Sequence, residues 1–108
     1  MSSNTVDRIN NFNRLYDDLD KETQINLDHF IAGIEEVGQH MVGETIYNGD
    51  TELLYKFMPC LQAISSTITY FQIDIDENKY IHKLKWTPDD FIIPSNVLVR
   101  ANERISSV

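Results

Sequence analysis

The 108-residue sequence has little of the features that mark several common protein classes. It contains one cysteine, Cys60, so it cannot form an intramolecular disulfide, and this favours a reducing compartment. No apolar run approaches the roughly 18 residues that a membrane-spanning helix needs. The first residues, MSSNTVDRINN, lack the basic start and apolar centre of a signal peptide. The sequence therefore predicts a cytoplasmic protein that has no membrane partner.

Motifs that carry chemistry are also missing. No glycine-rich loop with phosphate-binding spacing precedes a helical pattern. The histidines His29, His40 and His82 do not supply the paired Glu-x-x-His arrangement of a helical metal site. Cys60 has apolar neighbours where a reactive thiol needs a base, which indicates a small core residue. We therefore predict that the protein is not an enzyme and has no cofactor and no metal site.

The sequence does contain enough hydrophobic residues to form the core of one folded domain. Hydrophobic residues make up 42%, with five Phe, five Tyr and one Trp, and this composition argues against disorder. A chain of this length can bury about 60–65% of its unfolded surface without a disulfide or metal. We expect a single domain over 1–108, made of a helical part (about 4–66), a hairpin (about 67–86) and a C-terminal segment (87–108).

Apolar residues in the helical part recur three and four positions apart, as on one face of an α-helix. Such stripes predict two to three amphipathic helices that bury one side each. The members of the three stripes are Val6, Ile9, Phe12, Tyr16 and Leu19; Leu27, Phe30, Ile34, Val37 and Met41; and Leu54, Phe57, Leu61, Ile64 and Ile68.

The ends of these helices carry recognisable signals. Asp20 and Asp50 can each cap the helix that follows, since a carboxylate accepts from the free N–H groups of a first turn. The second helix should end before the turn at 48–49, or fray after Gly38. Pro59 lies inside the third stripe, so this helix either kinks there or is interrupted by a new start.

Beyond residue 67 the apolar residues alternate with polar ones, as in half-buried strands. The turn-like sequence DENK at 76–79 separates two such runs. We expect an antiparallel hairpin with a four-residue loop over 76–79, because this register places the apolar residues of both strands on one face, toward the helices. The expected cross-strand pairs are Thr69 with Trp86, Phe71 with Leu84, Ile73 with His82, Ile75 with Tyr80, and Asp76 with Lys79.

Two strands alone are marginal, so a third strand is expected, and residues 97–99 are the best candidate. Residues 95–105 fit a short helix as well, with Val97, Ala101 and Ile105 inward. Without a third strand, the open edge of the hairpin would invite strand addition from a second copy or another protein. The predicted fold is a two-layer α+β domain, in which helices pack on a small antiparallel sheet.

The net charge of −8 is unevenly distributed. Residues 1–78 carry four basic and fourteen acidic side chains, whereas residues 79–108 carry five basic and three acidic ones. Lys79, Lys83 and Lys85 interleave with aromatic residues, as in sheets that bind single-stranded nucleic acid. The expected register puts lysines and aromatics on opposite faces, and the overall charge is negative, so direct nucleic-acid binding is not expected.

Lack of catalytic motifs together with a well-patterned core indicates a non-enzymatic protein–protein interaction module: a regulator, an inhibitor or an assembly subunit. Its partner would be another protein or a second copy, as in a homodimer. The alternative is an acidic mimic of nucleic acid that inhibits a DNA- or RNA-binding protein, and it would depend on the acidic residues. The candidate partner-binding residues are Asp28, Glu35, Glu36, Lys79, Lys83 and Lys85.

Overall fold

The computed structural model describes residues 2–37, 42–76, 79–90 and 95–106. In these ranges the chain forms four helices and one three-stranded antiparallel sheet, which confirms the predicted α+β class. The helices are α1 (Ser2–Asp17), α2 (Lys21–Val37), α3 (Thr51–Ile64) and α4 (Ser95–Ser106). The strands are β1 (Glu44–Tyr47), β2 (Thr69–Asp76) and β3 (Lys79–Lys85), in the order β1-β3-β2.

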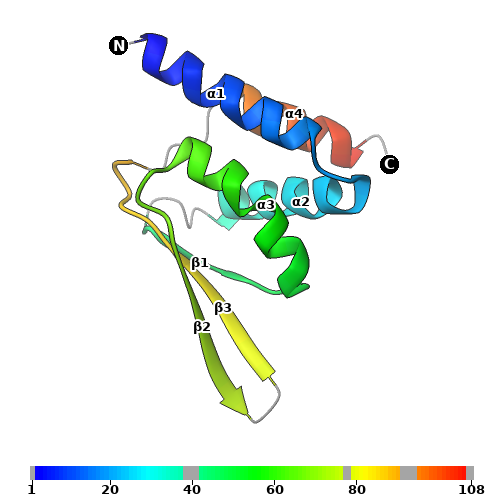
Figure 1. Ribbon diagram of the computed structural model, residues 1–108, viewed down its shortest axis with the longest axis vertical. Coiled ribbons are helices and arrows are strands. Elements are labelled where there is room, and N and C mark those ends of the chain that lie inside the picture. The colour runs from blue at the N-terminus through cyan, green and yellow to red at the C-terminus, as the bar shows by residue number, and fades with distance from the viewer. Residues whose placement is uncertain (1, 38–41, 77–78, 91–94, 107–108) are drawn as a thin grey trace.

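The helices lie together at one end of the molecule, and the β2–β3 hairpin projects away from them (Figure 1). Helix α1 packs on α3, α4 packs on α2, and α2 and α3 pack on each other. The sheet meets α2 and α3 through aromatic contacts, in which the Tyr47 ring lies 5.9 Å from the Phe30 ring and 5.4 Å from the Phe57 ring. The projecting hairpin contributes to an elongated shape of 46 × 32 × 24 Å.

The hydrophobic core joins all four helices to the part of the sheet nearest them. Leu27, Leu54, Leu61 and Leu84 come from α2, α3 and β3, and each is fully buried. Cys60 lies in this core as the sequence predicts, and burial raises the pKa of its thiol to about 12. Such a thiol stays protonated and unreactive while the protein is folded.

Both predicted helix caps are present. The Asp50 carboxylate accepts a hydrogen bond from the backbone N–H of Glu52 at 2.7 Å. The Asp20 carboxylate accepts hydrogen bonds from the backbone N–H and the hydroxyl of Thr23, the latter at 2.5 Å. Helix α3 runs continuously through the exposed Pro59, so the chain does not start a new helix there. The predicted fraying after Gly38 falls outside the described residues.

The third strand is not the predicted one. Residues 97–99 belong to α4, in which Val97 and Ala101 are buried, so the helical alternative for 95–105 is correct. The third strand is β1, in a segment that the sequence assigned to the second helix. Thr45 and Tyr47 are buried while the residues between and before them are exposed, and this alternation is that of a half-buried strand.

A left-handed residue, Gly43, brings β1 beside β3. Its φ of +79° is one that side chains rarely tolerate, and a Cβ atom there would lie 2.5 Å from the Trp86 carbonyl oxygen. The Trp86 N–H donates to the Gly43 carbonyl at 2.8 Å. Glycine at this position therefore allows the close backbone approach from which the β1–β3 ladder continues.

The register of the hairpin also differs from the predicted one. Phe71 pairs with Lys83 and Ile73 with Ile81, one position away from the expected partners. An irregularity between Asp74 and Asp76 corrects the offset, so the expected pair of Asp76 with Lys79 is present. Residues 77–78 of the predicted loop lie outside the described ranges. Since a shift by one residue reverses the facing of a strand, Phe71 and Ile73 lie on the side away from the helices.

Candidate functional site

The sheet has two faces of different character, which follow from the alternation of side chains along each strand. The inner face packs on α2 and α3, and the outer face is the opposite side of the sheet. The residues of the inner face are Thr45, Tyr47, Tyr70, His82 and Leu84. The residues of the outer face are Glu44, Ile46, Thr69, Phe71, Ile73, Ile81, Lys83 and Lys85.

Hydrogen bonds anchor the inner face to α3. The His82 ring shares a hydrogen bond with the Tyr70 hydroxyl through Nδ1 (2.8 Å) and with the Thr51 hydroxyl through Nε2 (3.2 Å). His82 is thus a buried histidine with a hydrogen-bond partner at each ring nitrogen. The Tyr55 and Tyr70 rings meet edge to face at 5.6 Å. Burial and the hydrogen bond with Tyr55 raise the pKa of Tyr70 to about 12.

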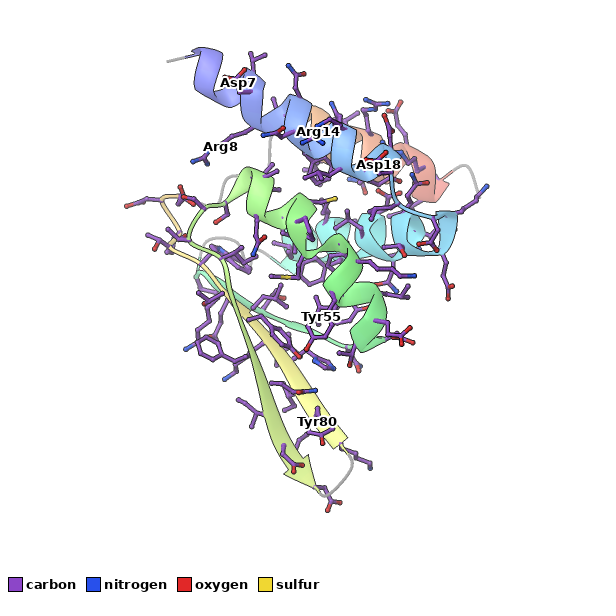
Figure 2. The ribbon with its side chains drawn as sticks, viewed as in Figure 1. Asp7, Arg8, Arg14, Asp18, Tyr55 and Tyr80 are labelled. Carbon is purple, nitrogen blue, oxygen red and sulfur yellow. The ribbon has the colours of Figure 1, made fainter. Side chains whose placement is uncertain are left out.

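The arm, residues 71–76 and 79–81, is the part of the hairpin beyond this anchor. Every residue of β2 within the arm is exposed. Figure 2 shows Tyr80 close to the free end of the arm, whereas Tyr55 lies on α3 beside the end of the sheet nearest the helices. The arm therefore extends past the surface that could bury it.

Large apolar side chains are exposed on the outer face. The exposed fraction is 54% for Ile46, 48% for Phe71 and 42% for Ile73, and these residues come from both edge strands of the sheet. Ile75, at the irregularity in β2, is also exposed. Several large apolar side chains exposed on one face of a small protein are typical of an interaction surface.

The three predicted lysines lie on β3, the central strand, between and beside these apolar residues. Lys83 is opposite Ile46 on one side and Phe71 on the other. The Lys85 ammonium group lies 5.8 Å from the Phe71 ring centroid and 3.9 Å from the Glu44 carboxylate. Lys79 is exposed on the arm, opposite Asp76. The outer face therefore carries exposed apolar side chains on its two edge strands and lysines on the central strand between them, an arrangement that suits contact with another protein.

The predicted acidic surface is not supported in the same way, because Asp28 is buried. Its side chain is 3% exposed and accepts hydrogen bonds from the Tyr16 hydroxyl at 2.8 Å and from Arg104 at 3.0 Å. Burial raises the pKa of Asp28, and the Tyr16 hydrogen bond and the Arg104 charge only partly offset this effect. Asp28 of α2 therefore stabilises the packing of α4 through its ion pair with Arg104, and its side chain is not accessible to a partner. The side chains of Glu35 and Glu36 lie outside the described part of the structure.

A polar joint, centred on Asp90, holds the helices at the point where the hairpin leaves them. The Asp90 carboxylate accepts from the Ser65 hydroxyl at 3.0 Å and the Thr67 N–H at 3.2 Å, and Arg8 of α1 lies 3.4 Å away. Burial acts to raise the pKa of Asp90, but these hydrogen bonds and the Arg8 charge outweigh it and lower the pKa. The joint therefore stabilises the direction in which the hairpin projects.

Other features of the described ranges concern metal ligands, helix hydropathy and cavities. No group of three or more His, Cys, Asp or Glu side chains in these ranges is placed to hold a metal ion. No described helix is both long and apolar enough to cross a membrane. An open hollow of about 470 Å³ lies between α2 and β1. Its lining includes Asn26, which accepts a hydrogen bond from the Tyr47 hydroxyl, and the exposed His29.

Comparisons with family models, curated proteins and solved structures give no match. The function is therefore argued from the residues of this chain.

The apolar part of the outer face was missed as a site in the sequence, although its signal was visible. The alternation of Phe71, Ile73 and Ile75 was assigned to the inner face, because apolar residues usually point toward a core. The exposed Ile46 was missed because its strand was not recognised.

Proposed function

We propose that this protein is a non-enzymatic interaction module, a regulator, inhibitor or assembly subunit, that binds another protein through its outer face. The observation that carries the proposal is the exposure of Ile46 on β1 and of Phe71 and Ile73 on β2, all on the outer face of the sheet. Removing apolar surface from water contributes about 25 cal/mol per Å², so covering these side chains would favour association.

The anchored inner face supports the same proposal. His82 and Tyr70 tie the sheet to α3, so the outer face is presented on a backbone that is already ordered. A preformed surface loses less conformational entropy on binding than a flexible one. The lysines between and beside these apolar side chains would help to orient the partner on the outer face.

The proposal is tested by photocrosslinking in the source cell. A photoreactive phenylalanine replaces Ile73 in one variant and Val99 in a matched control; Val99 is also an exposed apolar residue but lies on α4. We expect a discrete adduct, identified by mass spectrometry, from position 73 and not from position 99. Phe71→Asp combined with the crosslinker at 73 should remove the adduct. Absence of an adduct at 73, or equal adducts at both positions, would contradict the proposal.

A further inference from the structure

Strand β2 forms an edge of the sheet. In the strand order β1-β3-β2, its described residues pair with β3 on one side, and no described strand lies on the other (Figure 1). With eight residues it is twice as long as β1, the opposite edge strand. Residues of an edge strand direct alternate N–H and C=O groups outward, where a further strand can pair with them. β2 therefore offers a template for strand addition.

The two sides of β2 differ in chemistry over the arm. Phe71 and Ile73 are exposed on the outer face, whereas Gln72 and Asp74 point to the opposite side. The Asp74 carboxylate accepts a backbone hydrogen bond from Asp76 at 3.2 Å, and its cross-strand neighbour is Tyr80, not a lysine. A strand beside β2 would thus meet apolar side chains on one face and a carboxylate on the other.

We infer that β2 binds an extended segment of another protein in which basic and apolar residues alternate. Apolar side chains of that segment would pack beside Phe71 and Ile73, and its lysine or arginine side chains would lie beside Asp74, because cross-strand neighbours of opposite charge stabilise a sheet. The net charge of −8 attracts such a segment from a distance. The inference rests on the proposed function and names the partner's chemistry.

A second copy of this chain fits the edge less well. Pairing two β2 strands would bring the Asp74 and Asp76 carboxylates of both copies to one seam, between two molecules of like net charge. Charges and strand irregularities on an edge are common means by which proteins avoid pairing with themselves. Both are present here, with the irregularity between Asp74 and Asp76.

The test uses the full chain and synthetic peptides of eight residues, the length of β2. The test peptide alternates lysine with valine, and the first control alternates glutamate with valine. The second control is the lysine–valine peptide with its valine backbone nitrogens methylated, which removes the N–H donors along one edge of the peptide strand. Amide hydrogen exchange of the protein, followed by NMR, is the readout. We expect the lysine–valine peptide to protect β2 amides and both controls to leave them unprotected.

The variant Asp74→Lys sharpens the test by reversing the charge at an exposed position. Circular dichroism checks that it folds. We expect it to weaken binding of the lysine–valine peptide about five-fold and to create binding of the glutamate–valine peptide. Lys56→Glu, an exposed charge reversal on α3, is the matched control and should change binding less than Asp74→Lys.

Three outcomes of the peptide experiment would overturn the inference: no protection by the lysine–valine peptide, equal protection by the N-methylated peptide, or protection of β1 in place of β2. Concentration-dependent dimers of the protein with protected β2 amides, seen without peptide, would identify a second copy as the occupant and also overturn it. None of these results would remove a partner adduct at position 73, so failure of strand addition is distinguishable from failure of the proposed function.

Discussion

The helical body and the arm use similar residues for different purposes. The body consists of the four helices and the inner face of the sheet, and within it Ile34 is 1% exposed. The arm holds Ile73, in a regular strand, at 42% exposure. In the body an isoleucine stabilises the fold by filling space among close-packed neighbours. In the arm the same residue type remains exposed, and we propose that it serves binding. Position relative to the helices, not residue type, determines which role applies.

Matched truncations of these two isoleucines would test that comparison most strongly. Ile34→Ala should lower the free energy of unfolding by about 2–5 kcal/mol, because it leaves a cavity in the core. Ile73→Ala should lower it by less than about 1 kcal/mol, since the side chain is already hydrated. Urea denaturation followed by circular dichroism measures both values. Similar losses for the two variants would show that the arm is part of the folding core.

The pair of Asp28 with Arg104 tests whether the body tolerates a buried charge. Arg104→Met should destabilise the protein by about 2–4 kcal/mol near neutral pH, because it leaves the Asp28 carboxylate buried without its cation. The folded-state pKa of Asp28 is already raised, and removing Arg104 raises it further. The folded variant then binds a proton more strongly than the unfolded chain, so its stability increases as pH falls through that pKa.

Thermal unfolding of wild type and Arg104→Met at about pH 7 and about pH 5 measures this dependence. The difference in stability between the two proteins should shrink at the lower pH. Arg104→Lys keeps the charge and serves as the control. A difference that is the same at both pH values would mean that Asp28 is not the group left uncompensated.

The polar joint gives the smallest expected effect and connects the two regions. Asp90→Asn should cost about 1–2 kcal/mol at neutral pH, through weaker hydrogen bonds with Ser65 and Thr67 and loss of the Arg8 ion pair. The folded-state pKa of Asp90 is lowered, so its contribution is present above the usual aspartate pKa of about 4 and is lost as pH falls through the lower folded value.

Stability measured against pH for both proteins checks this prediction: the two curves should converge in acid. Amide exchange of β2 near Thr69 should also be faster in Asp90→Asn, while α2 is unchanged. If exchange in α2 accelerates equally, Asp90 stabilises the whole body and not the joint alone.

Helical periodicity and capping residues were sufficient to predict most of the body. Asp20 and Asp50 act locally, through hydrogen bonds to residues three and two positions away, so no tertiary information was needed. The strand at 44–47 was missed because its four residues are too few to establish a period of two. Its pairing depends on the left-handed backbone of Gly43, which the sequence permits but does not require.

The hairpin register was predicted wrongly for a related reason. Placing Phe71, Ile73 and Ile75 inward maximises burial only if helices cover the whole sheet. The helices cover its near end alone, where Tyr70 and Leu84 already fill the inner face, so the arm has no core to face. Of the candidate site, the lysines of β3 were predicted, whereas burial of Asp28 depends on α4, whose helical state the sequence left undecided.

Labelling of Cys60 with a thiol reagent can distinguish opening of the body from motion of the arm. Cys60 is the one thiol of the chain and is fully buried between helices. A thiol reagent can modify it only after the body opens, so under conditions of fast reclosing the labelling rate reports the free energy of that opening. Bending or fraying of the arm leaves the thiol covered. The labelling rate would therefore depend on unfolding of the body and not on motion of the arm. A partner bound to the arm alone would lower the labelling rate only to the extent that it stabilises the body.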